Sequence, residues 1–208
     1  MLVLMQLPSS DSELVQIVDS ALAGAARQAG EWLVCKPGCT QCCYGAFAIN
    51  ALDVLRLRAG MAALRDSNPS AAQEIVVRAE AWIAEFGPDY PGDLATGLLG
   101  DSEAEREGFE DFANDAPCPA LDLSTGLCGV YLFRPMTCRV FGPPVRVETA
   151  ENDSHALAHC ELCFIGASQA EVAACEMPIP HELEARLLDQ AGQIGDGRET
   201  LVAFALIS

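Results

Sequence analysis

The sequence predicts a mainly α-helical fold with a small β-hairpin, formed by a single domain over residues 1–208 and organised around a multi-cysteine metal centre. The length of 208 residues, half of them hydrophobic, allows one domain to bury a sizeable core. Apolar residues recur at helical spacing in several segments. Ten cysteines, four of them within residues 35–43, indicate metal ligands or disulfides rather than ordinary core residues.

The first helix is expected over residues 11–34, where apolar residues form one face. Ser10 and Glu13 have the spacing of a capping box, in which each side chain accepts a hydrogen bond from a free amide at the start of the helix. Pro37 and Gly38 then end the helix. They lead the chain into the cysteine cluster, which we expect in a loop because a loop backbone can curve around an ion.

Two further helices are expected in the first half of the chain. One covers residues 52–64, with Asn50 as its N-cap and Asp53 in its first turn. The next opens at Pro69, because proline is tolerated at the first helical position, where no amide hydrogen is needed. Residues 88–100 are rich in glycine and proline and predict a loop.

Short elements are expected in the middle of the chain. Residues 101–115 are acidic and carry two phenylalanines spaced for one side of a short helix, so their charge predicts a solvated face. Residues 121–127 place a Ser-Thr-Gly turn between apolar residues, which is typical of a β-hairpin. Residues 136–141 can form a single helical turn that carries Cys138.

The last part of the chain predicts a strand, a helix and an apolar end. Residues 145–153 have the pattern of a strand followed by a loop. Residues 178–208 form the C-terminal helix, expected over residues 181–193, and an apolar tail, residues 201–207. This tail must pack on the core or on a partner.

The acidic composition limits the possible partners. Twelve basic and thirty acidic residues give a formal net charge of −18, so the chain repels phosphate backbones and anionic lipid; we expect neither nucleic-acid nor membrane binding. A protein partner with a basic surface is compatible with this charge. The apolar start is short and lacks basic residues, and no run approaches the roughly 20 apolar residues of a membrane-spanning helix. We therefore expect a cytoplasmic protein with reduced thiols, which favours metal over disulfides.

Most of the cysteines are candidate metal ligands. Zinc binds four thiolates tetrahedrally, and a cubane iron–sulfur cluster takes four thiolates, one per iron. Spacings of two or three residues let one turn of backbone present two thiols to one centre, and remote ligands then hold distant segments to that turn. The candidate ligands are Cys35, Cys39, Cys42, Cys43, Cys118, Cys128, Cys138, Cys160 and Cys163.

The adjacent pair Cys42 and Cys43 bears on the number of metal atoms. Neighbouring side chains tend to diverge, so both thiols rarely serve one mononuclear ion. Two centres or one polynuclear centre use such a pair more naturally. Eight cysteines suffice for two four-thiolate sites, so the ten present favour more than one metal atom.

Four elements of the sequence reproduce a known cysteine pattern. They are Cys35-x3-Cys39-x2-Cys42-Cys43, Cys118-Pro-Ala-Leu121, Cys128-Gly-Val-Tyr131-Leu-Phe-Arg134-Pro135-Met-Thr-Cys138-Arg139, and Cys160. In these elements the chain resembles the YkgJ-type cysteine-cluster family, described as a zinc- or iron-chelating domain, with Val130 in place of the usual Ile. The resemblance covers about residues 35–163 and implies metal chelation.

The same pattern is similar to the cysteine-rich region of flagellin lysine N-methylases, in which an iron–sulfur cluster supports methyl transfer. This chain is short for such an enzyme and has no glycine-rich strand–loop–helix motif for a nucleotide-type cofactor. It departs from the pattern at Cys163, which makes a C-x2-C pair with Cys160, so either can be the last ligand. Cys175 lies outside the pattern and is expected to be a buried free thiol.

Two arginines and two histidines lie close to candidate ligands in the sequence. Arg134 and Arg139 flank Cys138 and are expected to hydrogen-bond thiolate sulfurs or inorganic sulfide and to reduce the negative charge of the site. The alternative is an ordinary ion pair with one of the many acidic residues. His155 and His159 would allow a mixed Cys/His zinc site, although the pattern supplies enough thiols without them.

The sequence therefore predicts a metal-binding protein whose multi-thiolate centre draws on three remote segments. Zinc and an iron–sulfur cluster both remain open as the cofactor, because both accept four thiolates. An alternative is an iron–sulfur-dependent enzyme or a maturation accessory, such as a protein with methyltransferase-like activity, which needs an open coordination position. A third alternative is a disulfide-rich secreted protein.

Overall fold

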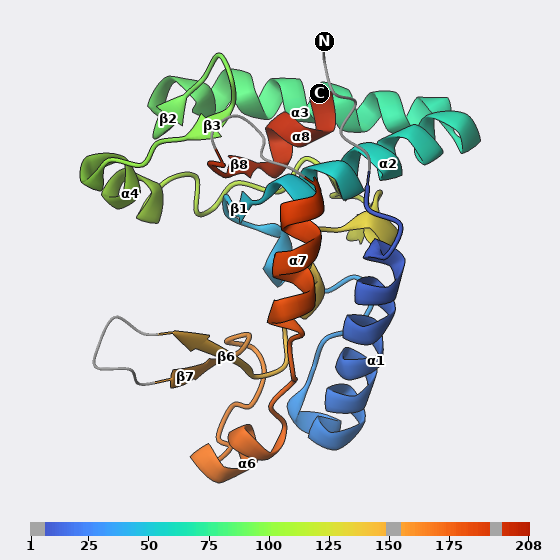
Figure 1. Cartoon of the computed structure of the whole chain (residues 1–208), viewed down its shortest axis with the longest axis vertical. Helices are drawn as coiled ribbons and strands as arrows, with labels where there is room; N and C mark the ends of the chain where they lie inside the picture. Colours follow the sequence, from blue (N-terminus) through green and yellow to red (C-terminus); the bar gives the residue numbers. More distant parts are fainter. Residues whose placement is uncertain (1–6, 149–154, 192–196) are drawn as a thin grey trace.

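The structure, a computed structural model, describes residues 7–148, 155–191 and 197–208. In this part of the chain, eight α-helices are joined by short 3-10 turns and short antiparallel strand pairs (Figure 1). The prediction of a mainly α-helical fold with minor β structure is confirmed.

Three helices form what we call the helical layer. Helix α2 (Ala51–Ser67) and helix α3 (Pro69–Phe86) pack against each other, and α8 (Val202–Ile207) packs on both of them. Leu57 and Leu206 are fully buried in the core between these helices. The apolar end of the chain thus packs on the core, and Figure 1 shows α8 between the other two helices.

The starts of α2 and α3 agree with the sequence. The Asn50 side chain accepts a hydrogen bond from the Asp53 amide at 3.1 Å. The Asn68 side chain accepts one from the Ala71 amide at 3.2 Å, with Pro69 at the first helical position. The predicted N-cap Asn50 and the predicted helix start at Pro69 are confirmed.

The first helix starts at the predicted residue but differs from its prediction in its end and in its cap. Helix α1 covers Asp11–Ala29 and is followed by a 3-10 turn, η1 (Gly30–Trp32), so the expected end at residue 34 is wrong. The chain leaves the helix at Gly30, which adopts a φ of 53° that favours glycine. Among the described residues Ser10 receives no hydrogen bond on its side chain from the helix, so the expected capping box is wrong too.

A small antiparallel sheet edges the helical layer. Its strand order is β1 (Ala48–Ile49), β8 (Thr200–Leu201), β3 (Leu98–Leu99) and β2 (Gly92–Asp93). The pair β2–β3 lies within the stretch that the sequence predicts as a loop, which is therefore corrected. A Cβ at Gly92 would lie 2.3 Å from the Leu98 carbonyl oxygen, so the close pairing of these strands depends on the glycine there.

The middle of the chain follows its prediction. Helix α4 (Glu103–Glu110) is the short acidic helix, and strands β4 (Leu121–Asp122) and β5 (Leu127–Cys128) form the expected hairpin. A 3-10 turn, η4 (Tyr131–Phe133), then leads into the expected single turn, helix α5 (Met136–Val140).

The remaining elements extend away from the helical layer. Strand β6 (Val145–Glu148) pairs with β7 (His155–Ala158), a second strand that the sequence analysis missed; part of the expected loop lies outside the described residues. Helix α6 (Gln169–Ala174) follows, and α7 (His181–Ala191) confirms the last predicted helix up to the end of its described part. Figure 1 shows α1 and α7 running from the helical layer toward α6 and the β6–β7 pair.

Candidate metal centre

The cysteine-rich loop is a succession of tight turns. The Cys39 amide donates to the Lys36 carbonyl at 2.9 Å, and the Cys43 amide donates to the Thr40 carbonyl at 2.8 Å. The second of these turns is the 3-10 turn η2 (Gln41–Cys43). These turns separate Cys35 and Cys39 from Cys42 and Cys43, which lie near different thiols of the rest of the chain. All ten cysteines are free thiols.

One set of thiols, which we call the five-thiol group, comes from the cysteine-rich loop, the β4–β5 hairpin with the residues before it, and α5. Its members are Cys42, Cys43, Cys118, Cys128 and Cys138. The Cys118 amide donates to the Cys43 carbonyl at 2.7 Å, which ties the loop to the hairpin. Cys118 and Cys128 pack against the core of the helical layer, so this group is held by the best-packed part of the molecule.

The electrostatics of the five-thiol group indicate crowding. A hydrogen bond from the Cys43 thiol lowers the pKa of Cys42 to about 6, and the positive charge of Arg134 also lowers it. Burial raises the pKa of Cys118 to about 12. Burial raises the pKa of Cys138 as well, and the neighbouring thiols add to that effect. Four or five thiolates cannot share this space without a cation, so the chemistry of the donors fits a metal centre.

A second set, the four-thiol group, lies near α6 and the end of β7. Its members are Cys35, Cys39, Cys160 and Cys163. The Cys35 and Cys163 sulfurs are 3.9 Å apart, and partial burial together with Cys163 raises the pKa of Cys35 to about 12. Cys160 and Cys163 are fully buried. The Cys163 amide donates to the Cys160 carbonyl at 2.9 Å, which makes a tight C-x2-C turn.

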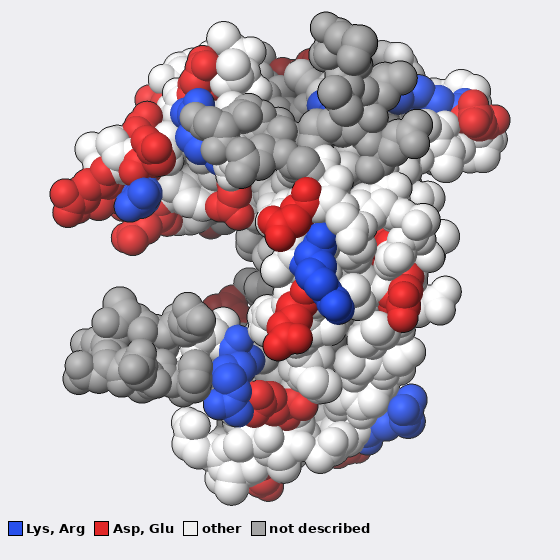
Figure 2. Space-filling model, in the orientation of Figure 1, with Lys and Arg blue, Asp and Glu red and all other residues white. Residues whose placement is uncertain are grey.

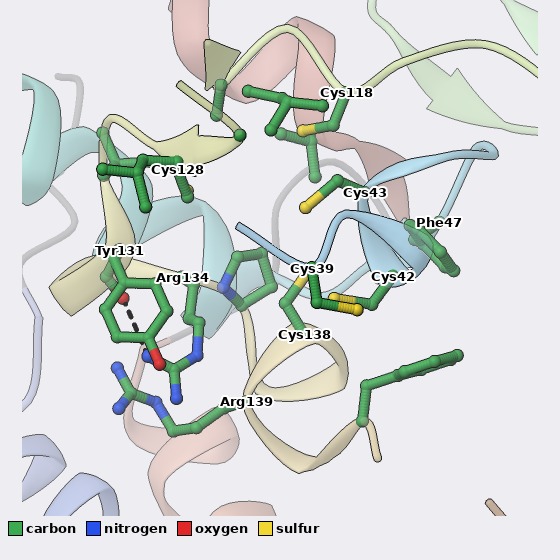
Figure 3. A pocket seen from close by; sticks show the side chains of 18 of the residues that line it. Cys39, Cys42, Cys43, Phe47, Cys118, Cys128, Tyr131, Arg134, Cys138 and Arg139 are labelled. Atoms are coloured by element: carbon green, nitrogen blue, oxygen red, sulfur yellow. Dashed lines mark hydrogen bonds between the residues drawn. The ribbon is translucent and has the colours of Figure 1, made fainter. Parts of the chain in front are cut away.

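A cavity of about 650 Å³ adjoins the thiols (Figure 3). Apolar side chains dominate its wall, and Arg134 and Tyr131 lie next to each other on that wall. The cysteines that line it are Cys35, Cys39, Cys42, Cys43, Cys118, Cys128 and Cys138. Cys160 and Cys163 are not part of this wall, so the four-thiol group faces the cavity only through its loop members.

The thiols of each group lie near one another but do not form a complete set of ligands around one point. In the part of the chain that the structure describes, no three His, Cys, Asp or Glu side chains are arranged to hold an ion as they stand. The donor types and their grouping fit thiophilic metals, so a site here would have to close around the ion. Coupling of metal binding to such closure is general for thiolate sites.

The two predicted arginines have different surroundings. Arg134 lies with its guanidinium carbon 4.0 Å from the centre of the Tyr131 ring, and its charge lowers the pKa of Cys42 and opposes the rise of the pKa of Cys128 that burial causes. Arg139 donates to both carboxylate oxygens of Asp19 on α1, at 2.7 and 2.8 Å. Its Nε is buried and has no hydrogen-bond partner among the described residues.

The remaining candidates lie at the edge of the four-thiol group. The Nδ1 atom of His159 is 3.1 Å from the Cys160 carbonyl oxygen, and its ring packs against Phe164. His155 belongs to strand β7. Cys175 is buried in the same apolar cluster as Cys160, so the expected buried free thiol is confirmed.

A buried ion network that the sequence analysis missed positions α5 and thereby Cys138. Arg56 of α2 donates to Asp11 at 2.9 and 2.6 Å and to Asp53 at 2.7 Å. Asp53 also accepts from the Met136 amide at 2.8 Å, at the start of α5. Asp53 and Arg56 are three residues apart in an otherwise apolar stretch of helix, a spacing that could have indicated a buried pair.

Comparison with known proteins places this arrangement in a family. The profile of the CxxCxxCC family, described as a "putative zinc- or iron-chelating domain", matches residues 34–163, well over half of the chain. The chain belongs to the CxxCxxCC family. No curated protein and no solved structure is similar enough to count as a match. The family expected from the cysteine spacing is confirmed, and with it a metal-chelating domain.

The match of the CxxCxxCC family includes both thiol groups, because it runs from just before Cys35 to Cys163. The mostly apolar helical layer is only partly inside it: α2 and α3 are matched, whereas α8 follows later in the chain. No helix among the described residues is long and apolar enough to span a bilayer.

Proposed function

We propose that this protein binds zinc or an iron–sulfur cluster through thiolates drawn from remote segments of the chain. The single observation that carries the proposal is the convergence of nine of the ten thiols into two groups beside one cavity. The five-thiol group and the four-thiol group supply the ligands, after loss of their thiol protons. A bound metal would neutralise the thiolates and supply a Lewis-acid or electron-accepting centre.

Residues near the five-thiol group support such a centre. Arg134 places a positive charge near Cys42 and Cys128, which compensates for part of the negative charge that several thiolates bring. Asp53 holds the start of α5, and therefore Cys138, in place. These residues act on the ligands and not on the metal itself.

The setting that we propose is the cytoplasm, where thiols stay reduced and available to metals. Acidic side chains gather over α4 (Figure 2), and most of them are exposed. We further propose that a partner, if the protein delivers or receives metal, meets this acidic surface with basic residues.

Anaerobic purification followed by metal and sulfide analysis tests the proposal. We expect either zinc without visible colour, or iron and sulfide in equal amounts with visible absorbance. A freshly prepared protein, never exposed to chelator, that contains neither zinc nor iron would refute it. Anaerobic handling matters because air can destroy an iron–sulfur cluster and let zinc take its place.

The cavity favours a second candidate, an iron–sulfur-dependent enzyme or maturation accessory with methyltransferase-like chemistry. Its volume of about 650 Å³ leaves room for a small molecule beside the five-thiol group. Such a function requires an open coordination position, whereas a centre closed by four thiolates argues for structure or metal handling. Addition of cyanide to the metal-loaded protein distinguishes the two, because only an open centre changes its spectrum without losing metal.

A further inference from the structure

The thiols of this protein are held by two different hydrophobic clusters. Cys118 and Cys128 pack against the core of the helical layer, next to Leu57. Cys160 and Cys163 are part of a separate small cluster that includes Ala29, Phe164 and Val172. The two groups are therefore anchored independently, although loop members of both face the same cavity.

The cysteine-rich loop divides its thiols between the two groups. Cys35 lies near Cys163 and Cys39 near Cys160, whereas Cys42 and Cys43 lie near the hairpin thiols. A Cβ on Gly142 would lie 3.2 Å from the Cys35 sulfur, and the Gly142 carbonyl accepts from the Cys160 amide at 3.1 Å. Gly142 thus lets the loop approach the C-x2-C turn closely.

One pair of sulfurs in the four-thiol group has the separation that one ion requires. The Cys35 and Cys163 sulfurs are 3.9 Å apart. Four thiolates around zinc, with Zn–S bonds of about 2.3 Å and tetrahedral angles, have sulfurs about 3.8 Å apart. In a cubane cluster each thiolate binds a different iron, so the ligand sulfurs must be farther from one another.

We propose that Cys35, Cys39, Cys160 and Cys163 hold one zinc ion in a closed four-thiolate site, separate from a second centre in the five-thiol group. The inference rests on the proposed function, that the thiols bind metal at all, and deepens it. Two short-spaced pairs, C-x3-C and C-x2-C, are the ligand arrangement of structural zinc sites. The four-thiol group has no ligand to spare, whereas the five-thiol group has one thiol more than a four-ligand centre needs.

A zinc ion at the four-thiol group would have a structural role. It would join the loop after α1 to the turn between β7 and α6, two segments more than 100 residues apart in the chain. Cys160 and Cys163 are buried, and the Cys35 sulfur already lies 3.9 Å from the Cys163 sulfur, so one edge of such a site is in place.

Two double variants of the full-length chain test whether the four-thiol group and the five-thiol group bind separate metals. We compare the wild type with a Cys160→Ser/Cys163→Ser variant and a Cys118→Ser/Cys128→Ser variant, all purified anaerobically, and measure zinc, iron and sulfide per chain. The first variant should lose one zinc per chain and keep the metal of the five-thiol group. The second should keep one zinc per chain and lose the rest. Cys175→Ser, a buried thiol outside both groups, is the matched control and should keep all metal.

The outcomes separate this inference from the proposed function. A wild type without metal refutes the proposed function and the inference together. A metal-loaded wild type whose two double variants lose the same metals in the same proportion has one shared centre, which overturns the inference alone. Full retention of metal in the Cys160→Ser/Cys163→Ser variant also overturns it.

A titration with Co²⁺ keeps the test valid if a variant folds poorly. Cobalt in a four-thiolate tetrahedral site gives visible bands that depend on geometry and on the number of thiolates. In the metal-free wild type these bands should rise in more than one step, and the step of the four-thiol group should saturate at one ion per chain. Prior addition of one equivalent of zinc should abolish that step, whereas an undiminished step after zinc addition would overturn the inference.

Discussion

The helical layer and the thiol-bearing loops, residues 30–43 and 159–175, are held together by different means. In the helical layer, Leu57 and Ile75 pack in an extended apolar core with almost no exposed surface. Around the loops, the buried cluster is small, and three of its six fully buried members are cysteines. The helical layer is stabilised by apolar burial. In the cluster around the loops, thiols occupy half of the buried positions, which leaves fewer large apolar side chains.

This difference determines which of the two regions should depend on bound metal for its stability. Burial of apolar surface contributes about 25 cal/mol per Å², so a small cluster offsets little of the conformational entropy lost when loops are ordered. Metal binding can offset the rest of this entropy loss, because the free energy of binding to an unformed site is partly folding free energy. We therefore expect the loops, and not the helical layer, to depend on the bound metal.

Metal removal should have the largest effect. After chelation of the full-length protein, backbone amides in residues 30–43 and 159–175 should exchange with solvent much faster, because the thiolate ligands no longer hold these loops. Amides in the middle of α2 and α3 should stay protected. Hydrogen exchange with mass spectrometry measures both regions in one experiment, and an equal loss of protection in both would contradict the comparison.

A cavity made in the helical layer should have the opposite effect. It should lower the stability of the fold and leave metal binding unchanged. Leu206→Ala removes a fully buried side chain of α8 and should lower the free energy of unfolding by about 2–5 kcal/mol. Val77→Ala on α3, where the side chain is half exposed, is the control and should change it by less than about 0.5 kcal/mol. Denaturant unfolding followed by helical circular dichroism measures the effect. Metal content per folded chain should be unchanged, and its loss would show that the two regions are not independent.

The buried ion network connects the two regions. Asp53→Asn leaves Arg56 with Asp11 alone and removes the carboxylate charge that accepts from the Met136 amide, so unfolding should become easier by about 3 kcal/mol. Asp66→Asn, an exposed position near the end of the same helix, is the control. Because α5 carries Cys138, the variant should also bind the metal of the five-thiol group more weakly. Unchanged binding despite lower stability would limit the network to a structural role.

The sequence predicts the helical layer better than the site, for reasons that particular residues make clear. Asn50 and Asn68 cap their helices through bonds to residues three positions away, so local sequence contains all that is needed. The strands β2, β3 and β7 are missed because they are only two to four residues long, too short for an alternation of apolar and polar residues to be recognised. The spacing of the cysteines predicts that they bind metal. It does not predict that Cys39 and Cys42, three residues apart, join different groups, since tertiary contacts decide that.

The smallest expected effect compares a helix that starts with a side-chain cap, α3, with one that starts without such a cap, α1. Asn68→Ala removes the side chain that accepts from the Ala71 amide and should lower the free energy of unfolding by about 1 kcal/mol. Ser10→Ala should change it by only a few tenths, because the Ser10 side chain caps no amide of α1 among the described residues. The urea midpoints of the two variants measure the difference. Equal losses would mean that Ser10 caps α1 in solution, and that the start of α1 is as well determined by local sequence as the start of α3.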